Sequence, residues 1–333
     1  MTGPARESFA LAAALTRLAG SLAVSGRPFD LWAPPLTPGD IEAMAERVAR
    51  GAAKVLWADE ADPDRGFLLY SPSLGETSFF GYGCARLAGP YIPPENQERR
   101  EAKAAGLARL IAARCRERGD RLVTIKTGLD PAVLRGLLAG GFVLAETVAV
   151  LTLDLTNDLV KAVWPSDGPP LGFVWLESSR DRERVEVLAS ALVEDLGDFF
   201  YDGHLRHDPR PGPEAARQIW RRTALEELAG AADKAADEAV ILCDSASGRG
   251  AGLATARLGR GREAGLSILA LAEPYQGRGL GRPLLLELIH RLLGRADRLR
   301  AETAAYNLPA LALYQSLGFR PAPPLAVLHL HDP

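Results

Sequence analysis

The order of apolar and polar positions predicts a mixed fold in the first half of the chain. Its elements are bounded by Pro, Gly, Asp and Ser residues, which favour turns. The predicted helices lie at Phe9–Leu22, at Asn96–Arg118 and after Asp130-Pro131, and the predicted strands at Lys54–Asp59, Gly66–Ser71, Ser78–Leu87, Leu122–Thr127 and Val143–Asp154. Strands and helices therefore mix in the order of an α+β fold.

The second half of the chain repeats this order. Helices are predicted at Arg180–Leu196 and Glu214–Leu228, and strands at Ala239–Cys243, Ala251–Leu258 and Glu263–Ala272. A helix from Arg282 to Leu293, a strand, a helix and a final strand complete the half. The repeated order suggests two copies of one fold.

An offset of 177 residues supports this interpretation. It carries Asp120-Arg121-Leu122 onto Asp297-Arg298-Leu299, and Gly141-Phe142 onto Gly318-Phe319. It also keeps the apolar alternation of the two last strands in phase. Chance likeness between two helix-to-strand units is the alternative. With Pro-rich residues Thr156–Pro170 as a linker, we expect two tandem α/β domains, 1–155 and 156–333, each a mixed, mostly antiparallel twisted sheet flanked by helices.

Composition narrows the classes of partner. The chain has 333 residues, 47% hydrophobic and 24% charged, with a formal net charge of −3. It offers no broad basic field, so we expect no nucleic-acid partner and no attraction to an anionic membrane surface. No uninterrupted apolar stretch is long enough to span a membrane, and the N-terminus lacks a secretory pattern, so we expect a cytoplasmic location. The three cysteines, Cys84, Cys115 and Cys243, lie far apart and predict neither disulfides nor a metal site.

The most informative segment is a glycine-rich turn between a strand and a helix. The strand contains Leu269 and Leu271, and the turn reads Gln276-Gly277-Arg278-Gly279-Leu280-Gly281. Alternate glycines let backbone N–H groups approach a phosphate, and the following helix presents its positive dipole end there. Arg278 can add a charged contact. The turn lacks the Gly-Lys-Ser/Thr of a nucleotide-hydrolase loop, and the preceding strands do not predict a dinucleotide-binding βαβ unit. A purely structural turn remains the alternative.

The elements after the turn carry a family resemblance. Asn307 precedes a helix that contains Tyr314 and ends in Leu317-Gly318-Phe319. Asn is a good helix N-cap, and Tyr314 follows two helical turns later on the same side. The glycine turn, the Asn307 cap and Tyr314-x-x-Leu317-Gly318-Phe319 together resemble the coenzyme-binding motifs of the GNAT superfamily of acyl-CoA-dependent N-acyltransferases. They cover about Gly250 to Leu330.

This resemblance implies an N-acetyltransferase that uses acetyl-CoA as cosubstrate and no metal. The coenzyme would lie on Leu269, Leu271, the turn from Gln276 to Gly281, Asn307 and Tyr314. Tyr314 would be the general acid for the leaving thiolate; its alternative is an ordinary packed tyrosine. Glu302 and Glu273, beside the coenzyme strands, are candidates for the base, as is a chain of water molecules. By the same offset Tyr314 falls on Leu137, Asn307 on Asp130, and the turn on residues 99–104, so we expect the first domain to be a degenerate copy without a coenzyme turn.

The acceptor side is expected before the second helix of the C-terminal half. Phe200, Tyr201, His204 and His207 are the candidate acceptor-binding residues. The segment is similar to the corresponding part of TDP-fucosamine-type amino-sugar N-acetyltransferases, which implies a small primary amine, such as a nucleotide-linked amino sugar, as substrate. Two histidines and Asp208 make a poor zinc site. A mycothiol-synthase-like acetyltransferase and a non-catalytic acyl-CoA-binding module are the alternatives. A homodimer is compatible with all three.

Overall fold

The computed structural model describes residues 38–57, 66–92, 95–156, 168–177, 212–229, 236–259 and 262–333. The chain forms two compact units. Unit 1 comprises Met1–Val148 and Pro323–Pro333, and unit 2 comprises Ala149–Ala322. The predicted helices at Phe9–Leu22 and Arg180–Leu196 lie outside the described residues.

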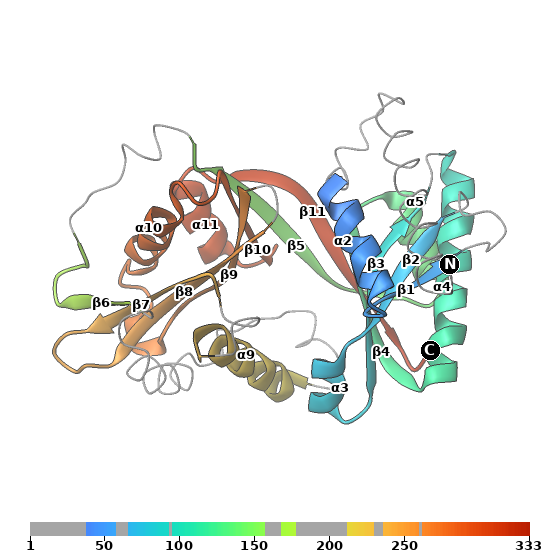
Figure 1. Ribbon diagram of the computed structural model, residues 1–333, viewed down its shortest axis with the longest axis horizontal. Helices are drawn as coiled ribbons and strands as arrows, with labels where there is room; N and C mark the ends of the chain where they lie inside the picture. Colours follow the sequence, from blue (N-terminus) through green and yellow to red (C-terminus); the bar gives the residue numbers. More distant parts are fainter. Residues whose placement is uncertain are drawn as a thin grey trace. The chain divides into compact units, whose positions relative to one another are not determined.

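Unit 1 contains a sheet with the order β1-β2-β3-β4-β11 (Figure 1). The β3–β4 pair is parallel, and β1–β2, β2–β3 and β4–β11 are antiparallel. Its elements are α2 (Pro38–Ala49), β1 (Lys54–Trp57), β2 (Phe67–Pro72), α3 (Leu74–Phe80), β3 (Gly83–Tyr91), α4 (Gln97–Arg118), β4 (Asp120–Gly128), α5 (Pro131–Ala139), the start of β5 (Val143–Asp154) and most of β11 (Arg320–His331).

The expected strand at Ser78–Leu87 is wrong in its first residues. Positions 78–80 are the end of helix α3, and the strand β3 begins at Gly83. The helix ends where Gly81 takes a φ of +73°, a conformation that glycine adopts without strain. The Thr77 hydroxyl then accepts the backbone N–H of Cys84 at 2.9 Å, which ties the turn to the strand.

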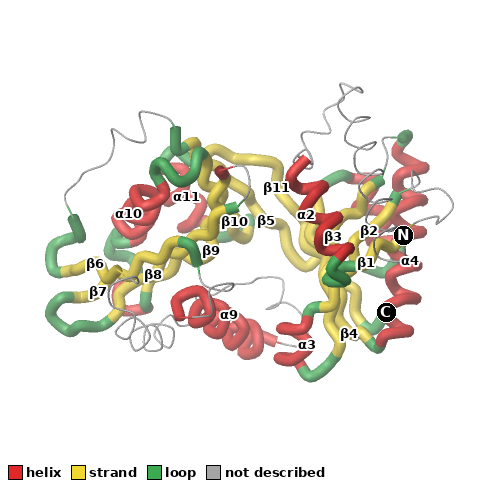
Figure 2. Tube along the Cα trace, viewed as in Figure 1, coloured by secondary structure: helices red, strands yellow, loops and turns green. Residues whose placement is uncertain are grey.

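The strands of unit 2 follow the order β5-β10-β9-β8-β7-β6. The β9–β10 pair is parallel, and β6–β7, β7–β8 and β8–β9 are antiparallel. Strand β6 was not predicted from the sequence. After the end of β5, the elements are β6 (Phe173–Glu177), α9 (Gly212–Ala229), β7 (Glu238–Asp244), β8 (Gly250–Leu258), β9 (Glu263–Leu271), the 3-10 turn η5 (Glu273–Tyr275), α10 (Gly281–Leu292), β10 (Arg298–Ala304) and α11 (Leu308–Ser316), coloured by type in Figure 2.

The last strands of the two sequence halves are exchanged. Under the 177-residue offset β4 corresponds to β10, and β5 corresponds to β11. Yet β4 pairs with β11 and β10 neighbours β5, so each half receives the final strand of the other. The boundary between the compact units lies inside β5, between Val148 and Ala149, and Pro323–Pro333 belong to unit 1. Alternation alone does not specify the partner of a strand, because both last strands carry the same pattern.

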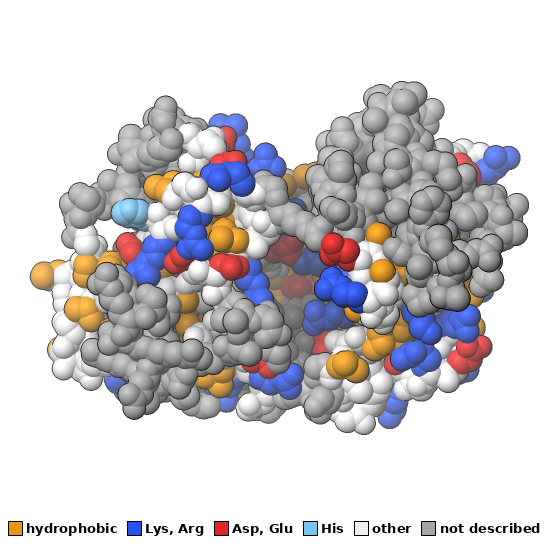
Figure 3. Space-filling view, in the orientation of Figure 1, with side chains coloured by type: hydrophobic (Ala, Val, Ile, Leu, Met, Phe, Trp, Pro, Cys, Tyr) orange, Lys and Arg blue, Asp and Glu red, His pale blue; other side chains and the backbone are white. Residues whose placement is uncertain are grey.

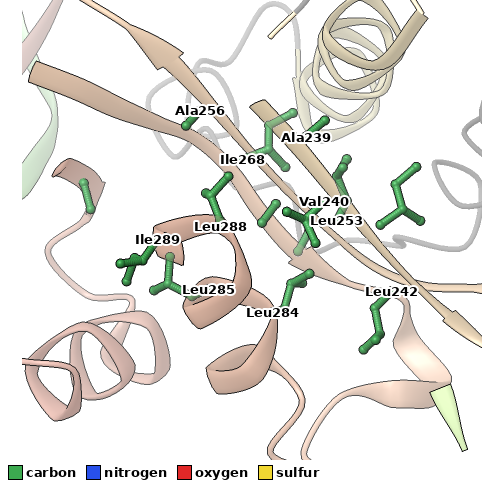
Figure 4. Packing of buried hydrophobic residues seen from close by; sticks show 14 of the residues in the cluster. Ala239, Val240, Leu242, Leu253, Ala256, Ile268, Leu284, Leu285, Leu288 and Ile289 are labelled. Carbon is green, nitrogen blue, oxygen red and sulfur yellow. The ribbon is translucent and has the colours of Figure 1, made fainter. Parts of the chain in front are cut away.

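The core of unit 2 lies between the sheet and helix α10. Leu284, Leu285, Leu288 and Ile289 repeat at helical spacing and are at most 1% exposed. Figure 4 shows this apolar side of α10 packed against the strands β7, β8 and β9. Strand β8 offers it only small residues, Gly252, Ala254 and Ala256, so the helix lies close to the sheet. This packing fixes the position of the turn that precedes α10.

Candidate functional site

The glycine turn follows strand β9 and the short 3-10 turn η5, and leads into helix α10. Gly277 and Gly279 have φ values of +71° and +75°, in the left-handed region that favours glycine. No atom lies within 4 Å of the place where a side chain would begin at either residue. No side chain caps the first turn of α10. The turn is therefore an open, solvent-facing surface of backbone N–H groups at a positive helix end, which suits a pyrophosphate.

The residues around these glycines fix the shape of the turn. The Gln276 side chain donates through Nε2 to the Leu271 carbonyl at 3.0 Å, so it closes the turn. Tyr275 is buried, and its hydroxyl donates to Asp244 Oδ2 at 3.1 Å. Arg278 places its guanidinium 5.4 Å from the centre of the Tyr275 ring. Sequence reasoning missed Tyr275 and Asp244, since a buried tyrosine beside a turn has no distinct signature.

Strands β9 and β10 diverge next to this turn. They pair only at their first residues, where Arg298, Leu299 and Arg300 face Glu263, Ala264 and Gly265. Strand β9 continues to Leu271, and its pairing with β8 carries an irregularity beside Ser267. Leu269 and Leu271, predicted to contact the coenzyme, lie on this diverging part. The β9 backbone groups that face β10 there are not used by a ladder with that strand.

Helix α11 carries the second group of predicted residues. Asn307 is its N-cap: Oδ1 accepts the Ala310 N–H at 3.3 Å, and Nδ2 donates to Thr303 Oγ1 at 3.0 Å. Tyr314 is only 5% exposed and packs its ring 5.3 Å from that of Phe319. Burial raises the pKa of Tyr314 from 10.0 to about 12, because the charged phenolate is poorly solvated there. The hydroxyl is thus protonated throughout the neutral range.

Helices α10 and α11 touch only at one end. Arg282 Nη1 donates to the Ser316 carbonyl at 3.2 Å, and a side chain built at Gly281 would begin 3.3 Å from Leu313. Elsewhere the two helices make almost no contact. Helix α11 therefore meets α10 directly after the glycine turn.

Glu302 lies on β10 in an ion pair with its strand neighbour. Arg300 donates to Glu302 Oε1 through Nε at 3.1 Å and through Nη2 at 2.9 Å. Both side chains are partly exposed. The other candidate base, Glu273, is exposed at the start of η5.

The four predicted acceptor residues, Phe200, Tyr201, His204 and His207, lie outside the described residues. The described part of α9, which follows them, contributes a buried carboxylate that sequence reasoning missed. Glu227 is 5% exposed and accepts hydrogen bonds from Thr255 Oγ1 and Arg257 Nε. A weak signal existed, because Glu227 lies among the positions of α9 that include the buried Ala224 and Leu228.

Two further observations concern the described residues. None of their helices is long and apolar enough to cross a membrane. No three of their His, Cys, Asp or Glu side chains come together as metal ligands would. On the face drawn in Figure 3, basic and acidic side chains of the described surface are interspersed.

Part of the second half matches a known protein family. Residues 198–319 match the model of the Acetyltransferase (GNAT) family, across the glycine turn, β10 and α11. This part of the chain is a GNAT-family domain. The match ends at Phe319, the last residue of the predicted Leu317-Gly318-Phe319 motif.

Solved structures extend the GNAT fold to nearly the whole chain. A tandem GNAT protein from the clavulanic acid biosynthesis pathway is 17% identical, with a TM-score of 0.57 over 97% of this chain and 95% of its own. A GCN5-related N-acetyltransferase from Sphaerobacter thermophilus is 15% identical, with a TM-score of 0.56 over 99% and 94%. The expected tandem GNAT architecture is confirmed.

A third structure is the GCN5-related glucosamine N-acetyltransferase region of a fungal multi-domain GH3 β-N-acetylglucosaminidase. It is 13% identical, with a TM-score of 0.57 over 95% of this chain and 37% of its own. No curated protein matches the chain. These identities are low, so the structural likeness describes the fold alone.

Proposed function

We propose that this tandem GNAT protein is an N-acetyltransferase that uses acetyl-CoA to acetylate the primary amine of a small molecule. Three features of unit 2 support the proposal. They are the open turn at Gly277 and Gly279, the part of β9 that does not pair with β10, and the buried Tyr314. Acyl transfer from a coenzyme thioester requires a site that binds the phosphates, backbone N–H groups that can stabilise the oxyanion, and a proton donor for the leaving sulfur.

The coenzyme would bind with its pyrophosphate on the turn from Gln276 to Gly281. Backbone N–H groups and the dipole of α10 would supply most of the interaction, and Arg278 would add a charge-assisted contact. The thioester arm would follow Leu269 and Leu271 of β9, with Asn307 and Tyr314 of α11 on its other side. Gln276 acts on the coenzyme through its backbone, since its side chain closes the turn.

The chemical step would be direct attack. The neutral amine adds to the thioester carbonyl, and a β9 backbone N–H beside the gap stabilises the oxyanion. The carbon–sulfur bond then breaks, and the hydroxyl of Tyr314 donates its proton to the departing sulfur. The proton lost by the amine passes to Glu302, directly or through water. Tyr314 holds its proton at neutral pH because burial raises its pKa to about 12.

The acceptor we propose is an amino sugar, free or nucleotide-linked. Aromatic side chains such as those of Phe200 and Tyr201 stack on sugar rings, and His204 and His207 can bind hydroxyl groups. One structurally similar protein is described as a glucosamine N-acetyltransferase. Unit 1 would then support the fold without binding coenzyme, so each chain would hold one coenzyme.

Thiol release from acetyl-CoA tests the function. The full chain is incubated with acetyl-CoA and a panel of amino sugars, amino acids and polyamines, and free thiol is measured continuously. We expect amine-dependent thiol release and an acetylated product by mass spectrometry. Tight binding of acetyl-CoA with no thiol release against the whole panel would instead identify a non-catalytic coenzyme-binding module.

A further inference from the structure

Charged side chains gather on the face of the unit 2 sheet that α10 does not cover. Thr255 of β8 points toward α9, because its hydroxyl donates to Glu227 of that helix. Side chains alternate along a strand, so Arg257 lies on the same face as Thr255. Its Nε donates to Glu227 Oε1 at 3.3 Å, and its side chain is 43% exposed.

The strand register continues this face toward the gap between β9 and β10. Arg257 is paired with Gly265 of β9, and Gly265 is paired with Arg300 of β10. Residues paired across strands share a face. Arg300 and Glu302, two residues apart on β10, therefore lie on this face as well. The Gly265–Arg300 pair is the last one before the two strands diverge.

Gly265, which has no side chain, lies between Arg257 and Arg300 in the sheet. Nothing lies within 4 Å of the place where a side chain would begin at Gly265. Arg257 on one side is anchored by the buried Glu227, and Arg300 on the other is held by Glu302. Both guanidinium groups are therefore oriented by carboxylates, which limits the conformational entropy that a ligand would have to restrict.

From this arrangement we infer that the acceptor carries an anionic group, a phosphate or a carboxylate, which Arg257 and Arg300 bind over Gly265. The inference rests on the proposed function and specifies its acceptor. The coenzyme turn and Tyr314 belong to the side of the sheet that bears α10 and α11, so the amine would approach from the side that bears α9. Guanidinium groups form paired hydrogen bonds with phosphate and carboxylate oxygens, and Glu302 lies beside them to take the amine proton.

Matched pairs of acceptors provide the test. Glucosamine 6-phosphate is compared with glucosamine, and β-alanine with β-alaninamide, by steady-state thiol release. We expect kcat/KM at least 10-fold higher for the anionic member of the better pair, and the better pair distinguishes phosphate from carboxylate. Equal values within both pairs, or a preference for the neutral members, would overturn the inference while leaving acetyl transfer itself intact.

Variants locate the anion site. In Arg300→Gln and Arg257→Gln we expect KM for the anionic acceptor to rise about 10-fold or more, with the Kd for acetyl-CoA unchanged. Because Arg300 also holds the proposed base Glu302, any change in kcat should be the same for both acceptors, and only the anionic acceptor should show the rise in KM. Arg298→Gln is the control, because Arg298 is exposed on the same strand but two pairs further from the gap. An equal effect in Arg298→Gln, or no effect in Arg300→Gln, would contradict the assignment.

Arg257→Gln leaves the buried Glu227 carboxylate without its ion-pair partner, so a second variant is needed to separate folding from anion binding. The double variant Glu227→Gln with Arg257→Gln removes both charges and preserves the hydrogen bond that Thr255 can make. We expect it to fold with a Tm near that of the wild type and to lose the preference for the anionic acceptor. A folded double variant that keeps this preference would exclude Arg257 from the anion site. If wild type fails to bind acetyl-CoA or to release thiol with any amine, the proposed function fails instead.

Discussion

The two units share corresponding helices and strands but differ at the segment that carries the glycine turn in unit 2. Under the 177-residue offset α5 corresponds to α11 end to end, and β5 to β11. Helix α4 differs from its counterpart α10. The offset carries its first residue, Gln97, onto Pro274, whereas α10 begins only at Gly281. About two turns of helix in unit 1 therefore replace the glycine turn of unit 2.

An ion pair occupies unit 1 at the positions that face the coenzyme in our proposal. Arg100 corresponds to Gly277 and Asp130 to Asn307, and Arg100 Nη2 lies 2.6 Å from Asp130 Oδ2 with both side chains 12% exposed. Asp130 also caps α5, by accepting the Ala132 and Val133 N–H groups. The cap function is thus common to both units, while the open turn exists in one.

Helix packing makes the same distinction. Gly136 and Gly140 of α5 lie against α4, and side chains there would begin 2.5 Å and 2.2 Å from the Cβ atoms of Ala104 and Ala108. Under the offset these glycines correspond to Leu313 and Leu317 of α11. Glycines let α4 and α5 meet at backbone distance, whereas α10 and α11 make little contact. In unit 1 the longer α4 and the glycines of α5 therefore fill the positions that correspond to the proposed coenzyme site of unit 2.

The largest effect should come from Tyr314, whose counterpart in unit 1 is Leu137. Tyr314→Phe keeps the packed ring and removes only the hydroxyl, so we expect kcat to fall by about 10²-fold or more, as for loss of a general acid. The Kd for acetyl-CoA and the Tm should change little. Tyr306→Phe is the control, because Tyr306 is exposed just before α11. A wild-type kcat in Tyr314→Phe would remove the acid from the mechanism.

The ion pair of unit 1 should matter for stability and not for coenzyme. Asp130→Asn retains the cap but leaves Arg100 without its charge partner, so we expect a loss of about 2–3 kcal/mol in the free energy of unfolding, measured with urea. Glu101→Gln weakens an exposed ion pair, Arg135–Glu101, between the same helices and should cost at most about 0.5 kcal/mol. If Asp130→Asn bound acetyl-CoA at a second site, the Arg100–Asp130 ion pair alone would be what prevents unit 1 from binding it.

The glycine turn should show a smaller effect, on coenzyme affinity. Gly279→Ala forces a non-glycine residue to a φ of +75°, at a cost of about 1–2 kcal/mol. Since the bound turn must keep this shape, we expect the Kd for acetyl-CoA to rise about 10-fold, measured by calorimetry. Gly248→Ala is the control. Gly248 has a φ of +70° and lies in the turn between β7 and β8, where we propose no ligand. Equal losses of affinity in both variants would make the turn only structural.

The smallest expected change concerns pH. The pKa of Tyr314 is raised from 10.0 to about 12 by burial, so its neutral form is favoured in the folded state. Its stabilising contribution is therefore complete below pH 10 and is lost between pH 10 and 12, amounting to about 2–3 kcal/mol. We expect kcat to show no fall up to pH 10. A fall in kcat with an apparent pKa near 8, absent from Tyr314→Phe, would contradict the raised pKa.

The sequence predicted those parts of the molecule that depend on local chemistry. The Asn307 cap, the glycine turn and the apolar periodicity of α10 are set by neighbours along the chain, and the structure contains all three as predicted. The 177-residue offset likewise aligns α5 with α11 from the sequence alone. Coenzyme binding and the roles of Tyr314 and Glu302 stay predictions.

Other features depend on partners distant in sequence and were not predictable. The exchange of β5 and β11 is decided by which sheet edge each strand meets, and the two strands carry similar patterns. Strand β6 is an edge strand of only five residues. Glu227 resembles a surface glutamate in sequence, and only its contacts with Thr255 and Arg257 show that it is buried.

The number of coenzymes bound per chain tests the central claim most directly. Calorimetric titration of the full chain with acetyl-CoA gives this number, and Gly279→Ala and Asp130→Asn indicate which unit binds. The account predicts one site per chain, weakened by Gly279→Ala and unaffected by Asp130→Asn. Two sites per chain, or one site that only Asp130→Asn weakens, would contradict it.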